Sequence, residues 1–173
     1  VQGWTYEYPI SFFDEKIHRI RRQSADADEI KDAISLLKNA KRPMIIAGGG
    51  VQYSGAVSEL TKFADKFQIP VVETIAGRAN LLESNGLNIG PIGVTGSNSA
   101  NNIAEQADVI LAIGTRLQDF TTGSWTAFSK DAKIIGLNVA RHDAAKHLSL
   151  TIVGDAKLGI TTVSYTHLRA HET

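Results

Sequence analysis

Short apolar runs alternate with amphipathic segments along most of this chain. Residues 44–47 (MIIA) are apolar without interruption, which is typical of a strand covered on both faces. Gly48, Gly49 and Gly50 follow directly, and a segment of helical periodicity begins near Ser54. A strand, a glycine turn and a helix in this order predict the first half of a βαβ unit. Such a turn lets another backbone, a phosphate or a flat ring approach the sheet.

The same alternation continues on both sides of this unit. Asp26 and Asp28 suit the amino end of a helix, and an apolar stripe follows them: Ile30, Ala33, Ile34 and Leu37. Apolar runs predict four further strands, at residues 70–74, 109–114, 134–139 and 151–154. Residues 78–99 are rich in Asn, Gly and Ser and are predicted to form a long loop, whose last serines can cap the next helix. The predicted fold class is α/β, a Rossmann-like doubly wound parallel sheet with helices on both faces.

Composition and charge narrow the class of protein. A chain of 173 residues fits one domain, and Lys+Arg and Asp+Glu balance at 18 each, so no bulk charge favours nucleic acid or a membrane surface. The absence of cysteine excludes a disulfide framework, a thiolate metal site and a cysteine nucleophile. Neither a membrane-spanning run nor a signal peptide is visible, so we expect a soluble, cytoplasmic protein. The chain begins without methionine, and we expect it to be a piece of a longer protein.

The first 25 residues precede any helical periodicity and read as a linker from a missing N-terminal domain. Aromatic residues come first, and a basic cluster at residues 16–22 follows. The cluster is either an anion or nucleic-acid patch, or a solvated linker that faces a neighbouring domain. The zero net charge favours the second interpretation.

The glycine turn matches a dinucleotide-binding fingerprint only in part. G-x-G-x-x-G counted from Gly48 requires glycine at position 53, which is Tyr53. Glu73 does end the second strand, where an acid that binds ribose would lie. Two interpretations stay open: a nucleotide site, or glycines that only allow a helix and a strand to pack closely.

Gly114 and Arg116 end the strand at 109–114, so Arg116 and Asp119 are expected at the same sheet edge as the glycine turn. Arginine suits phosphate or carboxylate recognition, and the alternative is an Arg116–Asp119 ion pair that holds its own loop. The histidines and serines offer less. His167 and His171 are spaced to share a metal if they are helical, but no acidic or thiolate partner is fixed nearby. No serine lies in a G-x-S-x-G turn. From the serines and histidines together, we predict neither a catalytic residue nor a metal site.

Five segments together resemble a known family: KRPMIIAGGGV, IPVVET, ADVILAIGTRLQDFTTG, IIGLNV and TIVGDAK. They are similar, over about residues 28–158, to the central domain of thiamine-diphosphate enzymes of the acetolactate synthase and pyruvate decarboxylase superfamily. Within it, the HRIRR segment and the loop that begins at Glu73 look most like the trihydroxycyclohexanedione hydrolases of myo-inositol breakdown.

The resemblance implies a parent enzyme of three domains. An N-terminal domain supplies the glutamate that activates thiamine, and a C-terminal domain holds Mg²⁺ and the diphosphate. The central domain joins them and supports a homodimer or homotetramer. Thiamine diphosphate and Mg²⁺ would then bind outside this chain, which alone is expected to be inactive. In the hydrolases, thiamine attacks a carbonyl of the cyclic dione and water opens the ring.

The resemblance also implies an alternative function. In flavin-containing relatives the corresponding domain binds FAD along this sheet edge, where Gly48, Gly49, Gly50, Gly114 and Arg116 fall. The chain would then be an FAD- or nucleotide-binding module of an acetolactate-synthase-like enzyme. The hydrolases are not expected to need flavin, and under that hypothesis these five positions are structural remnants.

Two departures from the family bear on the end of the chain. Gly154-Asp155 resembles the start of the Gly-Asp-Gly…Asn motif, but Ala156 follows and too little chain remains for the asparagine, so Asp155 is expected to cap a helix. The family continues into an amphipathic helix, whereas residues 165–173 carry no matching apolar stripe. Residues 164–173 are therefore predicted to be a foreign or read-through tail that leaves the last helix incomplete. Residues 26–163 remain as the central thiamine-enzyme domain.

Overall fold

The computed structural model describes residues 2–169 and contains one parallel sheet of six strands in the order β3-β2-β1-β4-β5-β6. The strands are β1 (Pro43–Ala47), β2 (Val71–Glu73), β3 (Asn88–Pro91), β4 (Val109–Ile113), β5 (Lys133–Asn138) and β6 (Leu150–Val153). The apolar run that precedes the three glycines is thus the inner strand β1, which pairs with β2 on one side and with β4 on the other. The expected α/β class and doubly wound sheet are confirmed.

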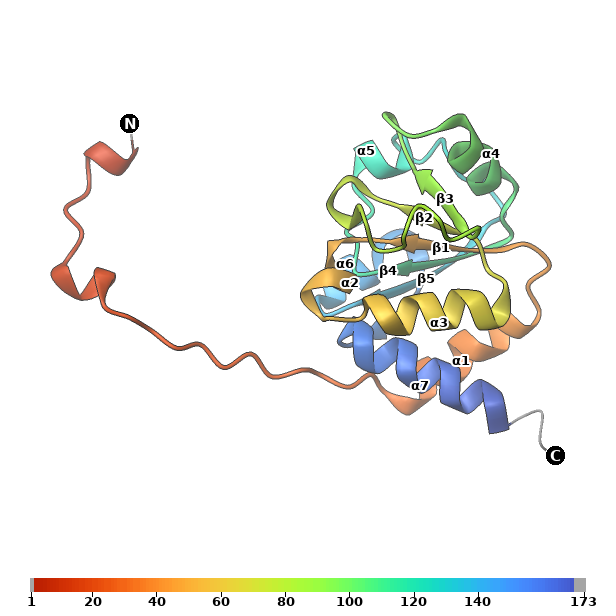
Figure 1. The fold of residues 1–173 in the computed structure, drawn as a ribbon, viewed down its shortest axis with the longest axis horizontal. Coiled ribbons are helices and arrows are strands. Elements are labelled where there is room, and N and C mark those ends of the chain that lie inside the picture. Colours follow the sequence, from red (N-terminus) through yellow and green to blue (C-terminus); the bar gives the residue numbers. More distant parts are fainter. Residues whose placement is uncertain (1, 170–173) are drawn as a thin grey trace.

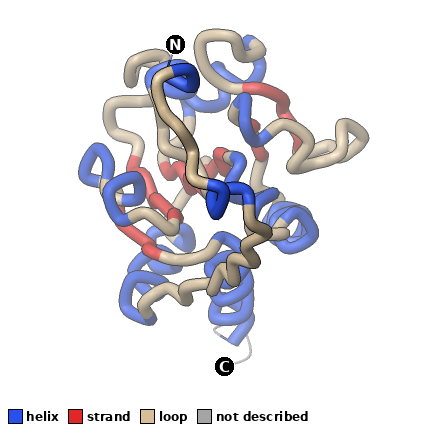
Figure 2. Tube along the Cα trace, turned by 90° about the vertical axis from the view of Figure 1, so that its left-hand side faces the viewer, coloured by secondary structure: helices blue, strands red, loops and turns tan. Residues whose placement is uncertain are grey.

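Helices cover both faces of the sheet (Figure 1). They are α1 (Ala27–Lys38), α2 (Gly49–Tyr53), α3 (Val57–Phe67), α4 (Asn98–Gln106), α5 (Asp119–Thr122), α6 (Arg141–Ala144) and α7 (Ala156–Arg169). In Figure 1, α1, α3 and α7 lie on one side of the sheet and α4 and α5 on the other. Figure 2, turned by 90°, shows the strands in the middle with helices around them.

Successive residues of β1 belong to two separate apolar cores, because neighbouring side chains of a strand point to opposite faces. Ile45 packs in the core that includes the buried stripes of α1, α3 and α7. Met44 and Ile46 pack in the other core, with Ala100 and Ala104 of α4. All three β1 side chains are fully buried, which accounts for the apolar run in the sequence.

Side-chain caps begin the helices where the sequence predicts them. Asp26 accepts hydrogen bonds from the backbone N–H groups of Asp28 (2.9 Å) and Glu29 (3.4 Å) at the start of α1. Ser97 accepts one from the N–H of Ala100 (3.1 Å) at the start of α4. Each cap satisfies backbone donors that the first turn of a helix leaves unpaired.

The loop predicted at residues 78–99 is wrong in one respect, because it contains the edge strand β3. Its four residues are only partly buried, and they pair on one side alone, with β2. An edge strand needs no continuous apolar run and tolerates a proline such as Pro91. The sequence signal for a strand was therefore missing.

Both ends of the chain differ from the central body. Residues 2–25 form an arm with two short 3-10 turns, Gln2–Trp4 and Ile10–Phe13, and it extends away from the body (Figure 1). At the other end, α7 continues to Arg169 and so includes the first residues of the predicted tail. The foreign origin of that tail and the domain boundaries stay predictions, and residues 170–173 lie outside the described part. Within residues 2–169, no helix is both long enough and apolar enough to cross a membrane.

Asp108 fastens the segment before β1 to the start of β4. Its carboxylate accepts hydrogen bonds from the backbone N–H groups of Lys41 (2.7 Å) and Arg42 (2.9 Å). Burial by itself raises the pKa of Asp108, but the backbone N–H groups around the carboxylate outweigh it and hold the pKa below its ordinary value. The ionised form therefore stabilises the fold. That stabilisation is complete above the unfolded-state pKa and is lost as pH falls through the lower folded-state pKa.

We predict that Asp108→Asn lowers the free energy of unfolding by about 1 kcal/mol at neutral pH, because the charge-assisted hydrogen bonds are weakened. The difference from wild type should shrink in acid, as wild-type Asp108 becomes protonated. Urea unfolding of both proteins at neutral pH and at about pH 3 measures the difference in the free energy of unfolding under each condition. Asp32→Asn, on the exposed face of α1, is the control and should change little. A deficit that is the same at both pH values would contradict the assignment.

Candidate functional site

Two glycine turns meet where the strand order reverses, at the carboxyl ends of β1 and β4. This position is the usual ligand crevice of open α/β sheets. Here the N–H of Gly48 donates to the carbonyl of Ile113 (2.9 Å), and the N–H of Gly50 donates to that of Gly114 (3.0 Å). A Cβ on Gly50 would lie 2.6 Å from the Cα of Gly114, and one on Gly48 would overlap the Gly114 carbonyl. The two backbones therefore fill the centre of the crevice themselves.

The remaining predicted site residues lie around this contact. Gly49 faces Ala76, where an added Cβ would lie 3.0 Å from the carbonyl oxygen, and Gly114 adopts the left-handed conformation (φ +60°). Arg116 is exposed, and its carbonyl accepts a hydrogen bond from the Nζ of Lys146 (2.8 Å). Among the described ion pairs none joins Arg116 to Asp119, so that alternative is wrong. The contacts of the four glycines fit the close-packing interpretation.

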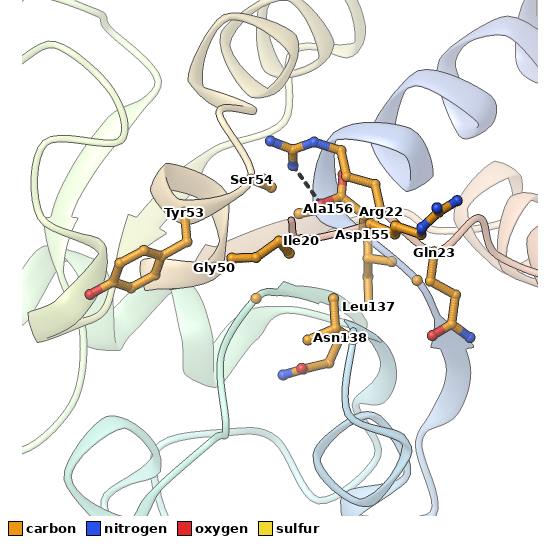
Figure 3. Close-up of a pocket in the computed structure, with 14 residues that line it drawn as sticks. Ile20, Arg22, Gln23, Gly50, Tyr53, Ser54, Leu137, Asn138, Asp155 and Ala156 are labelled. Atoms are coloured by element: carbon orange, nitrogen blue, oxygen red, sulfur yellow. Dashed lines mark hydrogen bonds and ion pairs between the residues drawn. The ribbon is translucent and has the colours of Figure 1, made fainter. Parts of the chain in front are cut away.

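A cavity of about 500 Å³ lies beside the glycine contact, between α2, the carboxyl ends of β5 and β6, and the end of the arm. Figure 3 shows Tyr53 on one side, Leu137 and Asn138 below, and Arg22 and Asp155 on the other side. Of the predicted site residues, Gly50 and Gly114 line this cavity, and Gly48, Gly49 and Arg116 do not.

Asp155 joins three parts of the chain at the wall of this cavity. One carboxylate oxygen accepts hydrogen bonds from the N–H groups of Lys157 (3.0 Å) and Leu158 (3.2 Å), which confirms it as the cap of α7. The other oxygen pairs with Nη1 of Arg22 at 2.7 Å. The N–H of Asp155 donates to the carbonyl of Gln23 (2.8 Å). Its side chain is only 8% exposed, so these contacts satisfy a carboxylate that is nearly out of water.

Buried polar side chains at this edge hold loops. Glu73, the candidate ribose acid, is buried and accepts hydrogen bonds from the N–H groups of Leu81 (2.9 Å) and Ala79 (3.3 Å). Asn80 is fully buried and donates to the carbonyl of Gly48 (3.0 Å). The sequence did not predict the structural roles of Asn80 and Arg22. Neither residue lies in a periodic pattern, and their partners, Gly48 and Asp155, are remote along the chain.

Candidate metal ligands are not gathered at this edge. Among residues 3–166, whose side chains the structure describes, no group of three or more His, Asp or Glu residues is placed to hold a metal ion. The pair His167 and His171 lies outside the described side chains.

We predict that Gly50→Ala lowers the free energy of unfolding by about 1–3 kcal/mol, because the new methyl group would meet the backbone of Gly114. Gly86→Ala is the matched control, since an added Cβ there meets nothing within 4 Å, and it should change stability by less than about 0.5 kcal/mol. Chemical denaturation of both variants measures the difference. Equal stability of the two would contradict the close contact.

We predict that Asp155→Ala lowers the free energy of unfolding by about 1–2 kcal/mol, because α7 loses its cap and Arg22 loses its partner. Asp155→Asn keeps a capping oxygen and should lose less. Arg22→Ala should cost under about 1 kcal/mol, since its side chain is 45% exposed. Thermal and urea unfolding rank the three variants. A ranking in which Arg22→Ala is the least stable would contradict the capping role.

Comparisons with known proteins place these features in a family. Residues 30–163 match the family described as thiamine pyrophosphate enzyme, central domain. The chain is 44% identical over 164 residues to 3D-(3,5/4)-trihydroxycyclohexane-1,2-dione hydrolase of Geobacillus thermodenitrificans, across 95% of this chain and 26% of that protein. It is also 44% identical over 165 residues to the protein of the same name from Clostridium tetani, with the same coverage. The chain thus spans about a quarter of the length of these curated relatives.

A solved structure shares the fold. A protein described as a thiamin diphosphate-dependent enzyme isolated from Mycobacterium smegmatis superposes with a TM-score of 0.71 at 20% identity, over 87% of this chain and 30% of that one. That likeness concerns the fold, whereas the family match covers most of the chain and includes both glycine turns and Asp155. The chain belongs to the thiamine pyrophosphate enzyme central-domain family.

Proposed function

We propose that this chain is the central, non-catalytic structural domain of a thiamine-diphosphate-dependent hydrolase that opens the ring of trihydroxycyclohexane-1,2-dione in inositol catabolism. The observation that carries the proposal is the 44% identity to hydrolases of that name across 95% of the chain. The similarity includes nearly the whole chain and is not confined to a short motif. The substrate class is inferred from those names.

The polar groups of the sheet edge support a structural role. Glu73, Asn80 and Asp155 each have a hydrogen-bond partner in the backbone of this chain. A catalytic acid or base has to reach its substrate, whereas these groups hold loops and a helix end in place. The catalytic groups are therefore assigned to the parts of the parent enzyme outside this chain.

Thiamine diphosphate and Mg²⁺ are assigned to missing N- and C-terminal domains of the parent enzyme. The share of 26% of the relatives' length leaves room for both domains. Thiamine diphosphate, when bound there, supplies a nucleophilic carbon for a carbonyl of the cyclic dione. Assembly as a homodimer or homotetramer and a cytoplasmic location remain expectations from the sequence.

The alternative, an FAD- or nucleotide-binding module, has less support. The curated relatives carry the hydrolase name, and the backbone contact of Gly48 and Gly50 with Gly114 occupies the centre of the crevice. Arg116 is exposed and does not line the neighbouring cavity. Flavin is therefore not part of the proposed function.

The test begins with the reading frame of the parent gene, sequenced across both ends of this segment. We expect a thiamine-activating domain upstream and a Gly-Asp-Gly…Asn motif downstream. The full-length protein, given thiamine diphosphate and Mg²⁺, should consume the cyclic dione and form the ring-opened deoxy-glucuronate, measured by liquid chromatography with mass detection. This 173-residue chain should show no turnover under the same conditions.

Two results would contradict the proposal. One is ring opening by the 173-residue chain alone. The other is a full-length protein that converts pyruvate to acetolactate and leaves the dione untouched. A flavin absorption spectrum in the purified full-length protein would favour the alternative module.

A further inference from the structure

The arm, residues 2–25, displays large apolar side chains to water. Trp4 is 94% exposed, Ile10 88% and Ile20 92%. Five more large apolar residues of the arm are also exposed: Tyr6, Tyr8, Phe12, Phe13 and Ile17. Single exposed apolar side chains are ordinary, but a contiguous set of this size marks a surface that binds something.

The apolar residues of the arm follow a pattern. Trp4, Tyr6, Tyr8 and Ile10 alternate with Thr5, Glu7 and Pro9. Trp4 and Ile10 belong to the two 3-10 turns, and the period of two gives the extended residues between them one apolar face, that of Tyr6 and Tyr8. The rings contact one another along the arm: the centroids of Tyr6 and Tyr8 lie 4.9 Å apart, and those of Tyr8 and Phe12 lie 4.7 Å apart. The pattern is that of a segment laid with one face against an apolar surface.

The arm is fixed to the central body at its carboxyl end. Arg22 pairs with Asp155 at 2.7 Å, and the carbonyl of Gln23 accepts a hydrogen bond from the N–H of Asp155 (2.8 Å). Gly154 lies against Ala25, where an added Cβ would be 2.9 Å from the backbone nitrogen. Upstream of these contacts, the arm runs away from the body in Figure 1. The aromatic residues are therefore tethered to the body through residues 22–25, but they lie away from it and are not packed on it.

The curated relatives align with most of the arm as well as with the central domain. The 164 aligned residues leave nine of the 173 outside, so most of the arm lies within the 44% identical region. The family match begins only at residue 30. The arm thus precedes the central domain in a chain about four times as long as this one.

We propose that the arm docks in extended form on an apolar groove of the domain that precedes it in the same polypeptide. The pair Arg22–Asp155 fixes its other end to the central domain. The inference rests on the proposed three-domain parent, in which this segment connects the first two domains. Docking removes the face of Trp4, Tyr6 and Tyr8 from water, and because both ends of the segment are held, it sets how the two domains are oriented.

Trypsin cleavage in the full-length protein tests the proposal, because Lys16 and Arg19 lie between the aromatic residues and Arg22. A docked arm is cleaved only when it opens, so its cleavage rate reports the open population. We expect the double variant Tyr6→Ser/Tyr8→Ser to be cut at Lys16 and Arg19 at least about tenfold faster than wild type. The rates are measured by mass spectrometry of the released peptides.

Glu7→Ser is the matched control, since Glu7 lies between the two tyrosines on the other face, and it should be cut at the wild-type rate. The central body should stay uncleaved in all three proteins, which shows that each is folded. Wild type cut as fast as the double variant would overturn the proposal. Protection that disappears on dilution would also overturn it, because the partner would then be a second copy.

The ring-opening assay separates this inference from the proposed function. A protected arm in a full-length protein that does not open the dione ring supports docking and contradicts the proposed activity. Ring opening with an unprotected arm keeps the proposed activity and contradicts docking.

Discussion

The backbone contact between the glycine turns after β1 and β4 fixes the centre of this domain. The turns approach so closely that Gly48 and Gly50 leave no space for a side chain. Their hydrogen bonds to Ile113 and Gly114 continue the β1–β4 ladder beyond the last paired residues, Ala47 and Ile113. The contact thus sets the position of α2 over the sheet and determines which part of the carboxyl edge remains open for the cavity.

The polar groups around that contact are used for structure. Asn80 reaches the carbonyl of Gly48 from a remote loop, and Glu73 holds the same loop through two backbone N–H groups. Asp155 joins the arm, the end of β6 and the start of α7 in one set of contacts. Burying a carboxylate costs free energy unless it is hydrogen-bonded, and the partners of Glu73 and Asp155 are parts of the chain itself. These contacts hold the loops and the helix start of this edge in place.

Membership of the central-domain family gives these contacts a context. The chain spans about a quarter of the length of its curated relatives, which are long enough to hold other domains beside this one. The sheet edge and the arm differ in what covers them. The first is packed by its own backbone, whereas the second has an apolar face that its own domain does not cover.

The sequence alone determined the elements whose signals are local. The apolar run before Gly48 specified a strand covered on both faces, and Asp26, Ser97 and Asp155 marked helix starts because a cap bonds to N–H groups within three residues. The family segments were likewise readable without coordinates. Only the tertiary structure decided the contacts between remote residues. β3 lacks an apolar run and is a strand because β2 lies beside it, and Arg22 pairs with Asp155 across 133 positions of the chain. The same packing put Gly50 and Gly114 against each other and left Arg116 exposed, because the path of the chain, and not the residue type, decides which backbone groups meet.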